Sequence, residues 1–225
     1  MADHTQTETL AVQFGALQAE RQRTWTPDQL ARNTAQRRDL VDRFDADRAV
    51  RPGDTLAPFA LTDVEGGTIR LDDLVANGPA VLIFFRYADC PACNIALPHY
   101  DRELRPALDA TGVALVAISP QTPERLRAIK TRHDLGLTVA TDPNNTLGRR
   151  LGITFAPDDR PSPPPAGWIG EVTGTGSWDL PQPTVLIVDK ARIVRFVAVS
   201  PDWLDRPEAQ DIVAALQHVR GTVAA

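Results

Sequence analysis

The sequence contains little cysteine and no long apolar segment. Only 2 of its 225 residues are cysteine, so a framework of disulfides does not hold the fold together. With 43% hydrophobic residues, a chain of this length buries an ordinary core without such cross-links. No apolar run approaches the roughly 20 residues that a membrane span needs. In a reducing compartment, two cysteines indicate catalysis, metal binding or sensing before a structural bridge.

Basic clusters and a targeting signal are missing as well. The net charge is -5, and no group of Lys and Arg forms a basic face, which argues against a nucleic-acid partner. The N-terminal stretch MADHTQTETL has no basic region followed by an apolar run, so a signal peptide is not expected. We therefore expect a cytoplasmic protein with neither a nucleic-acid nor a membrane partner.

Residues 1–48 are expected to form a helical N-terminal extension. Apolar residues at helical spacing predict a first helix over residues 5–23. Thr26-Pro27-Asp28-Gln29 combines a capping Thr, a Pro at the first helical position and a Gln three residues after the cap, which predicts a second helix to about Phe44. Neither helix carries an obvious chemical group. We expect the extension to pack on the main domain, residues 49–225, or on a second subunit of a homodimer.

Strands and helices alternate through the main domain. Continuous apolar runs predict buried strands, and capping signals predict helices between them. The predicted strands cover residues 80–85, 113–118, 137–140, 183–188 and 193–199, and a hairpin lies around residues 65–67. The predicted helices cover residues 91–108, 122–133, 144–151 and about 206–220, the third capped by Asn144-Asn145 and the last ended by Gly221. Residues 156–182, rich in Pro and Gly, predict a long loop. This alternation predicts an α/β layered fold.

Both cysteines lie between a predicted strand and a predicted helix, in FFRYADCPACNIALPHY. Cys90 comes directly before Pro91 at the helix start, where backbone amides lower the pKa of a thiol. Cys93 lies one turn further in. We predict that Cys90 attacks and Cys93 resolves, because the small ring that they would close stabilises the fold little. The alternatives are a structural disulfide, half of a zinc site, or two ordinary buried cysteines.

Two prolines add to this pattern. Pro98 lies inside the predicted helix, where it costs about 3 kcal/mol unless a kink is wanted. Pro183-Thr184 opens an apolar strand, the place where a strand tolerates Pro best. A cis bond at Pro183 would bring the backbone close to the thiols.

The Cys-x-x-Cys, Pro98 and Pro183-Thr184 resemble the pattern of the thioredoxin-fold superfamily. The longer segments resemble the alkyl hydroperoxide reductase/thiol-specific antioxidant (AhpC/TSA) family, in particular its peroxiredoxin-like members. These segments are PGDTLAPFALTDVEGGTIRLDDL, FFRYADCPACNIALPHY, VALVAISPQTPERL, PTVLIVDKARIVRFV and SPDWLDRPEAQDIVAAL. The resemblance implies a thioredoxin-like three-layer fold with a central mixed β-sheet and no cofactor. It also implies reduction of hydrogen peroxide or organic hydroperoxides by Cys90, with electrons from a thioredoxin- or glutaredoxin-type protein.

The chain departs from the peroxiredoxin pattern near the cysteines. The family has Thr or Ser where this chain has Tyr87, and an Arg where it has Pro183. Arg206 aligns with a second Arg of the family and Arg86 adjoins the turn, so either can replace the group that polarises the peroxide. The alternative for both is a solvated surface arginine. Asp89 next to the cysteine is expected to raise the pKa of Cys90.

These departures leave other functions open. One is a thioredoxin-like dithiol–disulfide oxidoreductase without efficient peroxidase activity. Another is a redox-regulated binding protein, in which the helical extension and residues 156–182 contact a partner. Trp168, Trp178 and Trp203 line a substrate groove or simply pack, and His99 is expected to face solvent.

Overall fold

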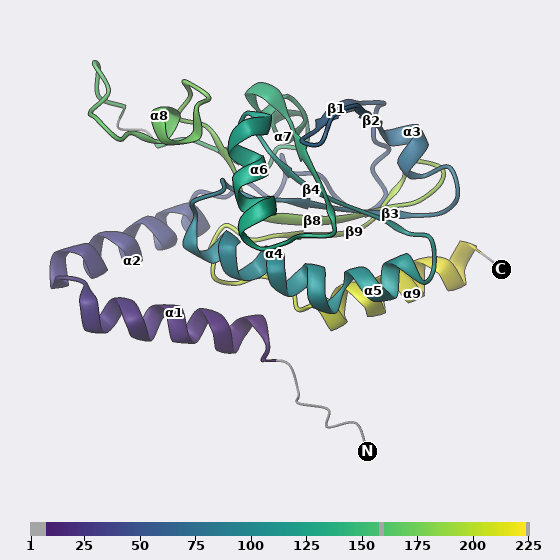
Figure 1. Ribbon diagram of the computed structural model, residues 1–225, viewed down its shortest axis with the longest axis horizontal. Coiled ribbons are helices and arrows are strands. Elements are labelled where there is room, and N and C mark those ends of the chain that lie inside the picture. The colour runs from purple at the N-terminus through teal and green to yellow at the C-terminus, as the bar shows by residue number, and fades with distance from the viewer. Residues whose placement is uncertain (1–7, 158–159, 224–225) are drawn as a thin grey trace.

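The computed structural model describes residues 8–157 and 160–223. In this part of the chain a central sheet has seven strands in the order β2-β1-β5-β4-β3-β8-β9 (Figure 1). The strands are β1 (Ala60–Asp63), β2 (Thr68–Arg70), β3 (Ala80–Phe84), β4 (Ala114–Ser119), β5 (Thr138–Thr141), β8 (Thr184–Val188) and β9 (Val194–Val199). β3 runs parallel to β4 and antiparallel to β8, so the sheet is mixed, as predicted.

Helices cover both faces of this sheet. They are α1 (Leu10–Thr24), α2 (Pro27–Asp42), α3 (Leu71–Leu74), α4 (Pro91–Glu103), α5 (Arg105–Asp109), α6 (Pro123–Arg132), α7 (Thr146–Arg150), α8 (Ile169–Thr173) and α9 (Ala209–Val223). Alternate residues of β3 enter two separate cores: Val81 and Ile83 pack with α4, α6 and α9, whereas Leu82 and Phe84 pack with α3 and α7. A strand that is buried on both faces has to be apolar throughout, which explains the unbroken run in the sequence.

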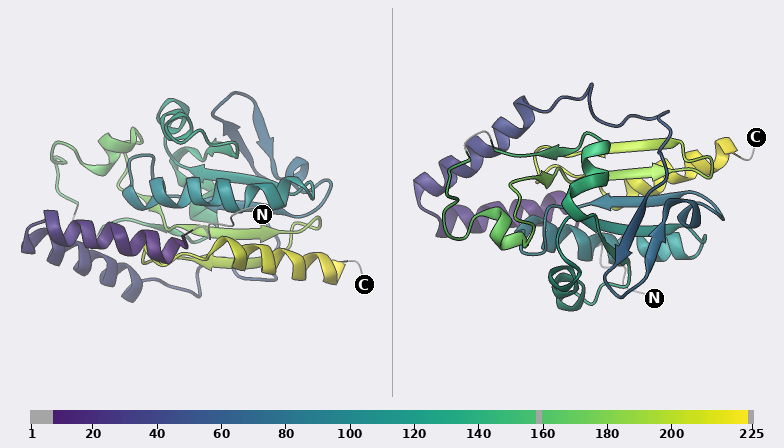
Figure 2. Two further views of the ribbon diagram at one scale, coloured as in Figure 1. Left: turned by 60° about the horizontal axis from the view of Figure 1, so that its bottom comes forward. Right: turned by 90° about the horizontal axis from the view of Figure 1, so that it is seen from above.

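The N-terminal extension forms a helical hairpin at one end of the sheet, and α1 packs against α4 (Figures 1 and 2). Leu10 and Phe14 of α1 and Leu40 of α2 belong to the same core cluster as α4 and α9. Arg37 of α2 also donates from Nε to Asp202 Oδ1 at 2.7 Å. The extension therefore packs on the rest of its own chain. Residues 5–7 of the predicted first helix lie outside the described residues, and the domain boundary at residue 48 stays a prediction.

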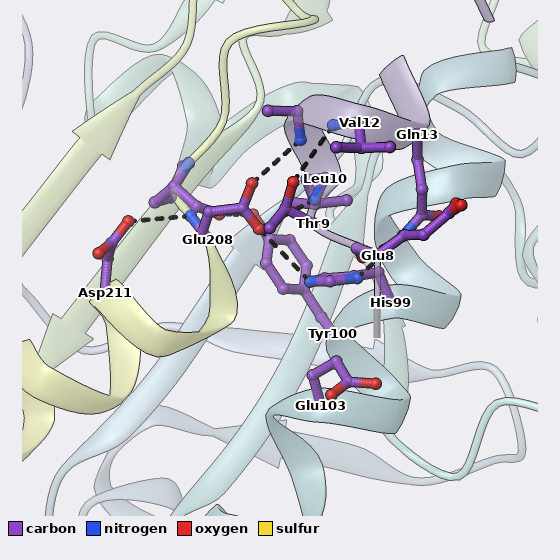
Figure 3. A network of polar contacts seen from close by, with 12 residues as sticks. Glu8, Thr9, Leu10, Val12, Gln13, His99, Tyr100, Glu103, Glu208 and Asp211 are labelled. Carbon is purple, nitrogen blue, oxygen red and sulfur yellow. Dashed lines mark hydrogen bonds and ion pairs between the residues drawn. The ribbon is translucent and has the colours of Figure 1, made fainter. Parts of the chain in front are cut away.

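The start of α1 is held by the C-terminal part of the chain. The Glu208 carboxylate accepts hydrogen bonds from the backbone N–H groups of Leu10, at 2.9 Å, and Ala11, at 3.0 Å (Figure 3). Thr9, the N-cap of α1, accepts from the next N–H, that of Val12. The first three amides of the helix, which have no partners inside it, are thus satisfied.

Several predicted boundaries were wrong. The helix predicted over residues 91–108 is two helices, because Pro106 cannot donate a hydrogen bond to the preceding turn. Asn145 precedes α7 in a left-handed conformation and makes no side-chain cap. The Asp142 carboxylate caps instead, accepting from the amides of Leu147 and Gly148 at 2.9 Å. The last helix continues through Gly221 to Val223.

The region predicted as a long loop is partly ordered into elements. It contains α8, and β7 (Leu180–Pro181) pairs antiparallel with β6 (Thr154–Phe155) in a second small sheet. This pairing joins residues that are far apart along the chain, so a local sequence pattern does not reveal it. In the described part of the chain, no helix is long and apolar enough to cross a membrane.

Candidate active site

Cys90 and Cys93 lie where β3 passes into α4. After β3 ends at Phe84, residues 85–89 turn into α4, whose N-cap is Cys90 and whose first residue is Pro91. Proline suits this position because the N–H that it lacks would have no partner in the helix. Cys93 follows one turn later, and its amide donates to the Cys90 carbonyl oxygen at 3.0 Å. The strand and the helix start thus place two thiols side by side.

Both cysteines are free thiols in the protein interior. Only 2% of the surface of Cys90 and 0% of that of Cys93 is exposed. Burial disfavours a thiolate, so any negative charge here must be stabilised by neighbouring groups. Among the described residues, no group of three or more His, Cys, Asp or Glu side chains could hold a metal ion. The zinc alternative therefore finds no further ligands in this part of the chain.

The two thiols share one hydrogen bond, and it separates their pKa values. The hydrogen bond with Cys93, together with burial, raises the pKa of Cys90 well above its ordinary value. Burial would also raise the pKa of Cys93, but the Cys90 hydrogen bond and the guanidinium of Arg206 outweigh it and hold that pKa well below its ordinary value. These contacts favour the thiolate at Cys93 over that at Cys90. This is opposite to the expectation that Cys90, at the helix N-terminus, has the lower pKa.

Arg206 is a buried partner of the thiols. It is 9% exposed, and its Nη2 donates to Cys93 Sγ at 3.5 Å. Its Nε donates to the Trp203 carbonyl oxygen at 3.0 Å. The Phe14 ring of α1 lies 5.7 Å from its guanidinium carbon. The alternative of a solvated surface arginine is wrong at this position.

Arg86 is the second buried arginine, 8% exposed, in the turn before Cys90. Its guanidinium carbon lies 4.2 Å from the centre of the Trp203 ring and 5.5 Å from that of Phe155. Its charge favours the thiolate of Cys90. Its Nε is buried and has no hydrogen-bond partner within the described structure. The solvated alternative is wrong here too.

Tyr87 and Asp89 behave differently from each other. Tyr87 is half-buried beside Arg86, and burial, followed by the charge of Cys90, raises the pKa of its phenol. Asp89 is exposed and forms an ion pair with Arg132 at 3.3 Å. It is not among the main influences on the pKa of Cys90, whose largest cause is the hydrogen bond with Cys93. The pKa of Cys90 is raised, but its causes are the hydrogen bond with Cys93 and burial, and not the expected charge of Asp89.

A comparison with protein families agrees with this geometry. A model described as the AhpC/TSA family matches residues 52–197, well over half of the chain and including both cysteines and Arg86. The chain belongs to the AhpC/TSA family.

Two curated relatives illustrate the range of this AhpC/TSA member. The peroxiredoxin bcp1 of Schizosaccharomyces pombe is 26% identical over 106 residues, which are 47% of this chain and 54% of that protein. The thiol-disulfide oxidoreductase ResA of Halalkalibacterium halodurans is 31% identical over 120 residues, 52% of this chain and 66% of that protein. The matched part is thus only 54% to 66% of the length of these relatives.

Solved structures show the same fold as this AhpC/TSA chain. Peroxidoxin BcpB from Mycobacterium tuberculosis aligns with a TM-score of 0.59 and 23% identity, covering 76% of this chain and 98% of that chain. Reduced Prx3 from Vibrio vulnificus, in complex with hydrogen peroxide, aligns with a TM-score of 0.60 and 21% identity, covering 74% and 99%. The predicted thioredoxin-like, peroxiredoxin-like fold is confirmed.

Pro183 and Thr184 lie beside the site of this AhpC/TSA chain but bond elsewhere. The peptide bond before Pro183 is trans, and the Pro183 carbonyl oxygen accepts from Ser200 N at 2.8 Å. The Thr184 hydroxyl donates to the Gln182 carbonyl oxygen at 2.9 Å. Together with Arg206 they line a small cavity. In the described part of the chain, no hydrogen bond joins Pro183 or Thr184 to either thiol.

A larger cavity lies next to Phe155, whose ring contacts Arg86. It has a volume of about 530 Å³, within the usual range for ligand sites. Phe155, which contacts the Arg86 guanidinium, lines it together with Leu40 and Gln182. The Gln182 Oε1 atom is buried and has no partner in the described structure. Phe155 therefore connects this cavity to Arg86.

Sequence reasoning missed several residues that build the site. Gln121 accepts a hydrogen bond from Ala88 N and so holds the turn before Cys90. Trp203 packs against Arg86 in the core, one of the two roles considered for it. His99 is buried beside Gln13, not exposed to solvent. These roles depend on contacts between distant segments and cannot be read from a local pattern. The one usable signal in the sequence is Gln121, a polar residue directly after a predicted buried strand.

Proposed function

We propose that the protein is a thiol-dependent peroxidase that reduces hydrogen peroxide or organic hydroperoxides through a Cys90–Cys93 dithiol/disulfide cycle. The observation that carries this proposal is a buried pair of thiols at a helix start, with the buried Arg206 bonded to Cys93 and the charge of the buried Arg86 favouring the thiolate of Cys90. Such groups stabilise both a thiolate and the oxygen that leaves when a peroxide bond breaks. Family membership supports the same chemistry.

In the proposed reaction, Cys90 attacks the terminal oxygen of ROOH. The O–O bond breaks, the Cys90 sulfur becomes a sulfenic acid, and RO⁻ leaves and takes up a proton to give ROH. The Cys93 thiolate then attacks the Cys90 sulfur and expels hydroxide, which is protonated to water, and the disulfide forms. The protein has lost two electrons and the peroxide has gained two.

The shared hydrogen bond assigns the first proton. The Cys90 thiol donates to the Cys93 sulfur in the reduced protein. When Cys90 attacks, its proton passes to Cys93, which acts as the general base and then gives the proton to RO⁻, so that Cys93 is a thiolate again when it attacks the sulfenic acid. Arg86 and Arg206 stabilise the negative charge at both sulfurs throughout. The low pKa of Cys93 and the nucleophilic role of Cys90 are therefore compatible.

We propose that a thioredoxin- or glutaredoxin-type protein then reduces the disulfide by thiol–disulfide exchange, in the cytoplasm. The names of the relatives, which include peroxiredoxins, support a peroxide substrate. Tyr87, Pro183 and Thr184 shape the walls of the site in this proposal and take no part in the bond changes. A homodimer is compatible with the family but carries no step of the reaction.

A dithiol–disulfide oxidoreductase is the second candidate. The likeness to the thiol-disulfide oxidoreductase ResA favours it. The burial of both sulfurs favours a small hydroperoxide in the oxidation step, whereas any protein partner, the reductant included, requires the site to open. A small hydroperoxide needs a much smaller opening.

The test adds one equivalent of hydrogen peroxide or of tert-butyl hydroperoxide to the reduced protein and follows free thiols and peroxide together. We expect one peroxide to be consumed for every two thiols lost. Cys90→Ser should consume none, and Cys93→Ser should stop at a sulfenic acid that dimedone traps. Peroxide that survives for minutes beside two free thiols excludes the proposal. Reduction of insulin by the same protein would then support the second candidate.

A further inference from the structure

The turn that leads from β3 to Cys90 is held by side chains from outside it. The backbone N–H of Ala88, which is buried two residues before Cys90, donates to Gln121 Oε1. The Ala88 carbonyl oxygen accepts from Asn94 Nδ2 at 2.7 Å and from Arg132 Nη1 at 3.3 Å. Gln121 lies between β4 and α6, Asn94 in α4 and Arg132 in α6. Three separate segments thus fix the backbone just before the first cysteine.

Asn94 connects this turn to the cysteines themselves. Its Nδ2 also donates to the Cys90 carbonyl oxygen, at 2.9 Å. The same oxygen accepts from the backbone amides of Cys93 and Asn94, at 3.0 Å each. One side-chain donor group therefore joins the Ala88 and Cys90 carbonyls, and the Cys90 carbonyl takes part in three hydrogen bonds. With its peptide group fixed in this way, the direction of the Cα–Cβ bond of Cys90 is fixed as well.

The other end of the Asn94 amide is held by the C-terminal end of α6. Its Oδ1 accepts from Arg132 Nη1 at 2.9 Å and from Nε2 of His133, the C-cap of that helix, at 2.7 Å. An amide side chain has two N–H donors and two acceptor positions, and here all four are used. Because a guanidinium can only donate, Arg132 also sets which way the amide faces. Asn94 therefore has one orientation, in which it bonds α6 to the Cys90 turn.

Such fixation matters to a pair of thiols that must join and separate. Forming a disulfide removes conformational freedom from the chain that carries the two sulfurs. Where hydrogen bonds already hold that chain in the dithiol form, less freedom remains to be lost. One sulfur then meets the other at a higher effective concentration.

We propose that Asn94 is a positioning residue of the dithiol, which holds Cys90 against Cys93 and so raises the effective concentration of one sulfur at the other. The inference deepens the proposed peroxidase. It rests on that function only for the fate of the sulfenic acid, because the effective concentration belongs to the two sulfurs whatever oxidises them.

The test equilibrates the protein with mixtures of reduced and oxidised glutathione. Two protein thiols become the Cys90–Cys93 disulfide while one glutathione disulfide is reduced to two glutathione thiols. The effective concentration is the ratio of squared reduced to oxidised glutathione at which half of the protein is oxidised. Asn94→Ala should lower it about tenfold, because the donor that joins two carbonyls of the turn is lost. His133→Phe, which removes one support of Asn94 and leaves the turn bonded, should lower it by a smaller factor.

Asn145→Ala is the matched control. The Asn145 amide also donates to a backbone carbonyl, that of Asp179 at 2.9 Å, but on the face of the sheet opposite to the cysteines. It should lower resistance to urea and leave the effective concentration unchanged. A folded Asn94→Ala protein, verified by circular dichroism, that keeps the parent value overturns the inference. A higher value does so too, because the contacts would then favour the dithiol. Asn94→Leu, which keeps the side-chain volume, replaces Asn94→Ala if that variant does not fold.

One equivalent of hydrogen peroxide separates this inference from the peroxidase itself. In Asn94→Ala the sulfenic acid of Cys90 should wait longer for Cys93, so dimedone should trap several-fold more of it than in the parent protein. A lowered effective concentration without peroxide consumption would retain the role of Asn94 and reject the peroxidase. Peroxide consumption with an unchanged effective concentration would do the reverse.

Discussion

At the scale of single residues, the shared hydrogen bond shifts the pKa values of Cys90 and Cys93 in opposite directions. The start of α4 favours a thiolate at Cys90, as the sequence predicts. Arg206 lies 113 residues beyond Cys93 in the chain and bonds to its sulfur, not to that of Cys90. A direct, buried contact with a charged group outweighs the partial charge of the helix end. The sequence therefore predicts the pair and its chemistry, but not which sulfur carries the charge.

Single-cysteine variants test this division. Cys93→Ala removes the largest cause that raises the pKa of Cys90, so the Cys90 pKa should fall, with Arg86 and Arg206 now lowering it. In Cys90→Ala, Cys93 loses a hydrogen bond but keeps Arg206, so its pKa should stay below the ordinary value. A thiolate is present above its pKa, so alkylation of Cys93 by iodoacetamide should persist at lower pH than that of a free cysteine.

Two outcomes would contradict this account. One is that both variants are alkylated with the pH dependence of an unperturbed thiol, near a pKa of about 8.5. The other is that Cys90 keeps its raised pKa after Cys93 is removed, which would make burial, and not the hydrogen bond, the dominant cause. An Arg206→Met variant of Cys90→Ala provides the control, since its Cys93 should lose the low pKa.

At the scale of elements, most helices and strands of the sheet follow from their own sequence. β3 is apolar throughout because both its faces are covered, and Thr26 and Gln29 form the reciprocal capping box at the start of α2 that their spacing predicts. Two of the errors share a cause: the β6–β7 pair and the burial of His99 depend on residues that meet only after the chain folds. The cap of α7 is a local contact instead, from Asp142 five residues before Leu147.

The N-terminus of α1 is the sharpest example, because its cap comes from the other end of the chain. Glu208 accepts from Leu10 and Ala11, and its Oε2 also lies 3.7 Å from His99 Nε2 of α4 (Figure 3). Its negative charge is well placed at the positive end of the helix. Glu208 thus joins α1, α4 and the start of α9 at one point.

We expect Glu208→Ala to lower the free energy of unfolding by about 1–2 kcal/mol, the usual value of a cap. Urea unfolding followed by circular dichroism measures this change. Glu20→Ala is the control, because Glu20 is on the same helix in an exposed ion pair with Arg23 and should change stability by less than about 0.5 kcal/mol. Equal effects of the two substitutions would mean that the contacts of Glu208 contribute nothing beyond surface charge.

At the scale of the whole molecule, the helical extension and the sheet domain share one core. The sequence predicts that residues 1–48 are a separate helical extension, because Arg51-Pro52-Gly53-Asp54 is a turn signal directly after it. The structure places Leu10, Phe14 and Leu40 in the cluster that surrounds the cysteines. Since no separate core is present in the described part of the extension, we expect it to unfold together with the domain and not before it.

Phe14→Ala tests this coupling. Phe14 is 3% exposed and lies between α1 and the Arg206 guanidinium, so its truncation should cost about 3–5 kcal/mol. Hydrogen exchange of the intact protein should show peptides of α1 and α4 opening with similar free energies. In Phe14→Ala, both should lose protection together. Val12→Ala is the matched control, since Val12 is 54% exposed on the same helix and should change neither.

If only α1 loses protection in Phe14→Ala while α4 stays protected, the extension is a separately unfolding unit and the shared core is rejected. That result would also have a chemical consequence. With α1 detached, the thiols would lose the cover of Leu10 and Phe14, and Cys90 in the variant should react with bulky maleimides that barely label the parent protein. A single core requires that α1 and α4 lose protection together and that maleimide labels Cys90 of the folded fraction slowly. The reason is that Cys90 then becomes accessible only when the whole protein unfolds.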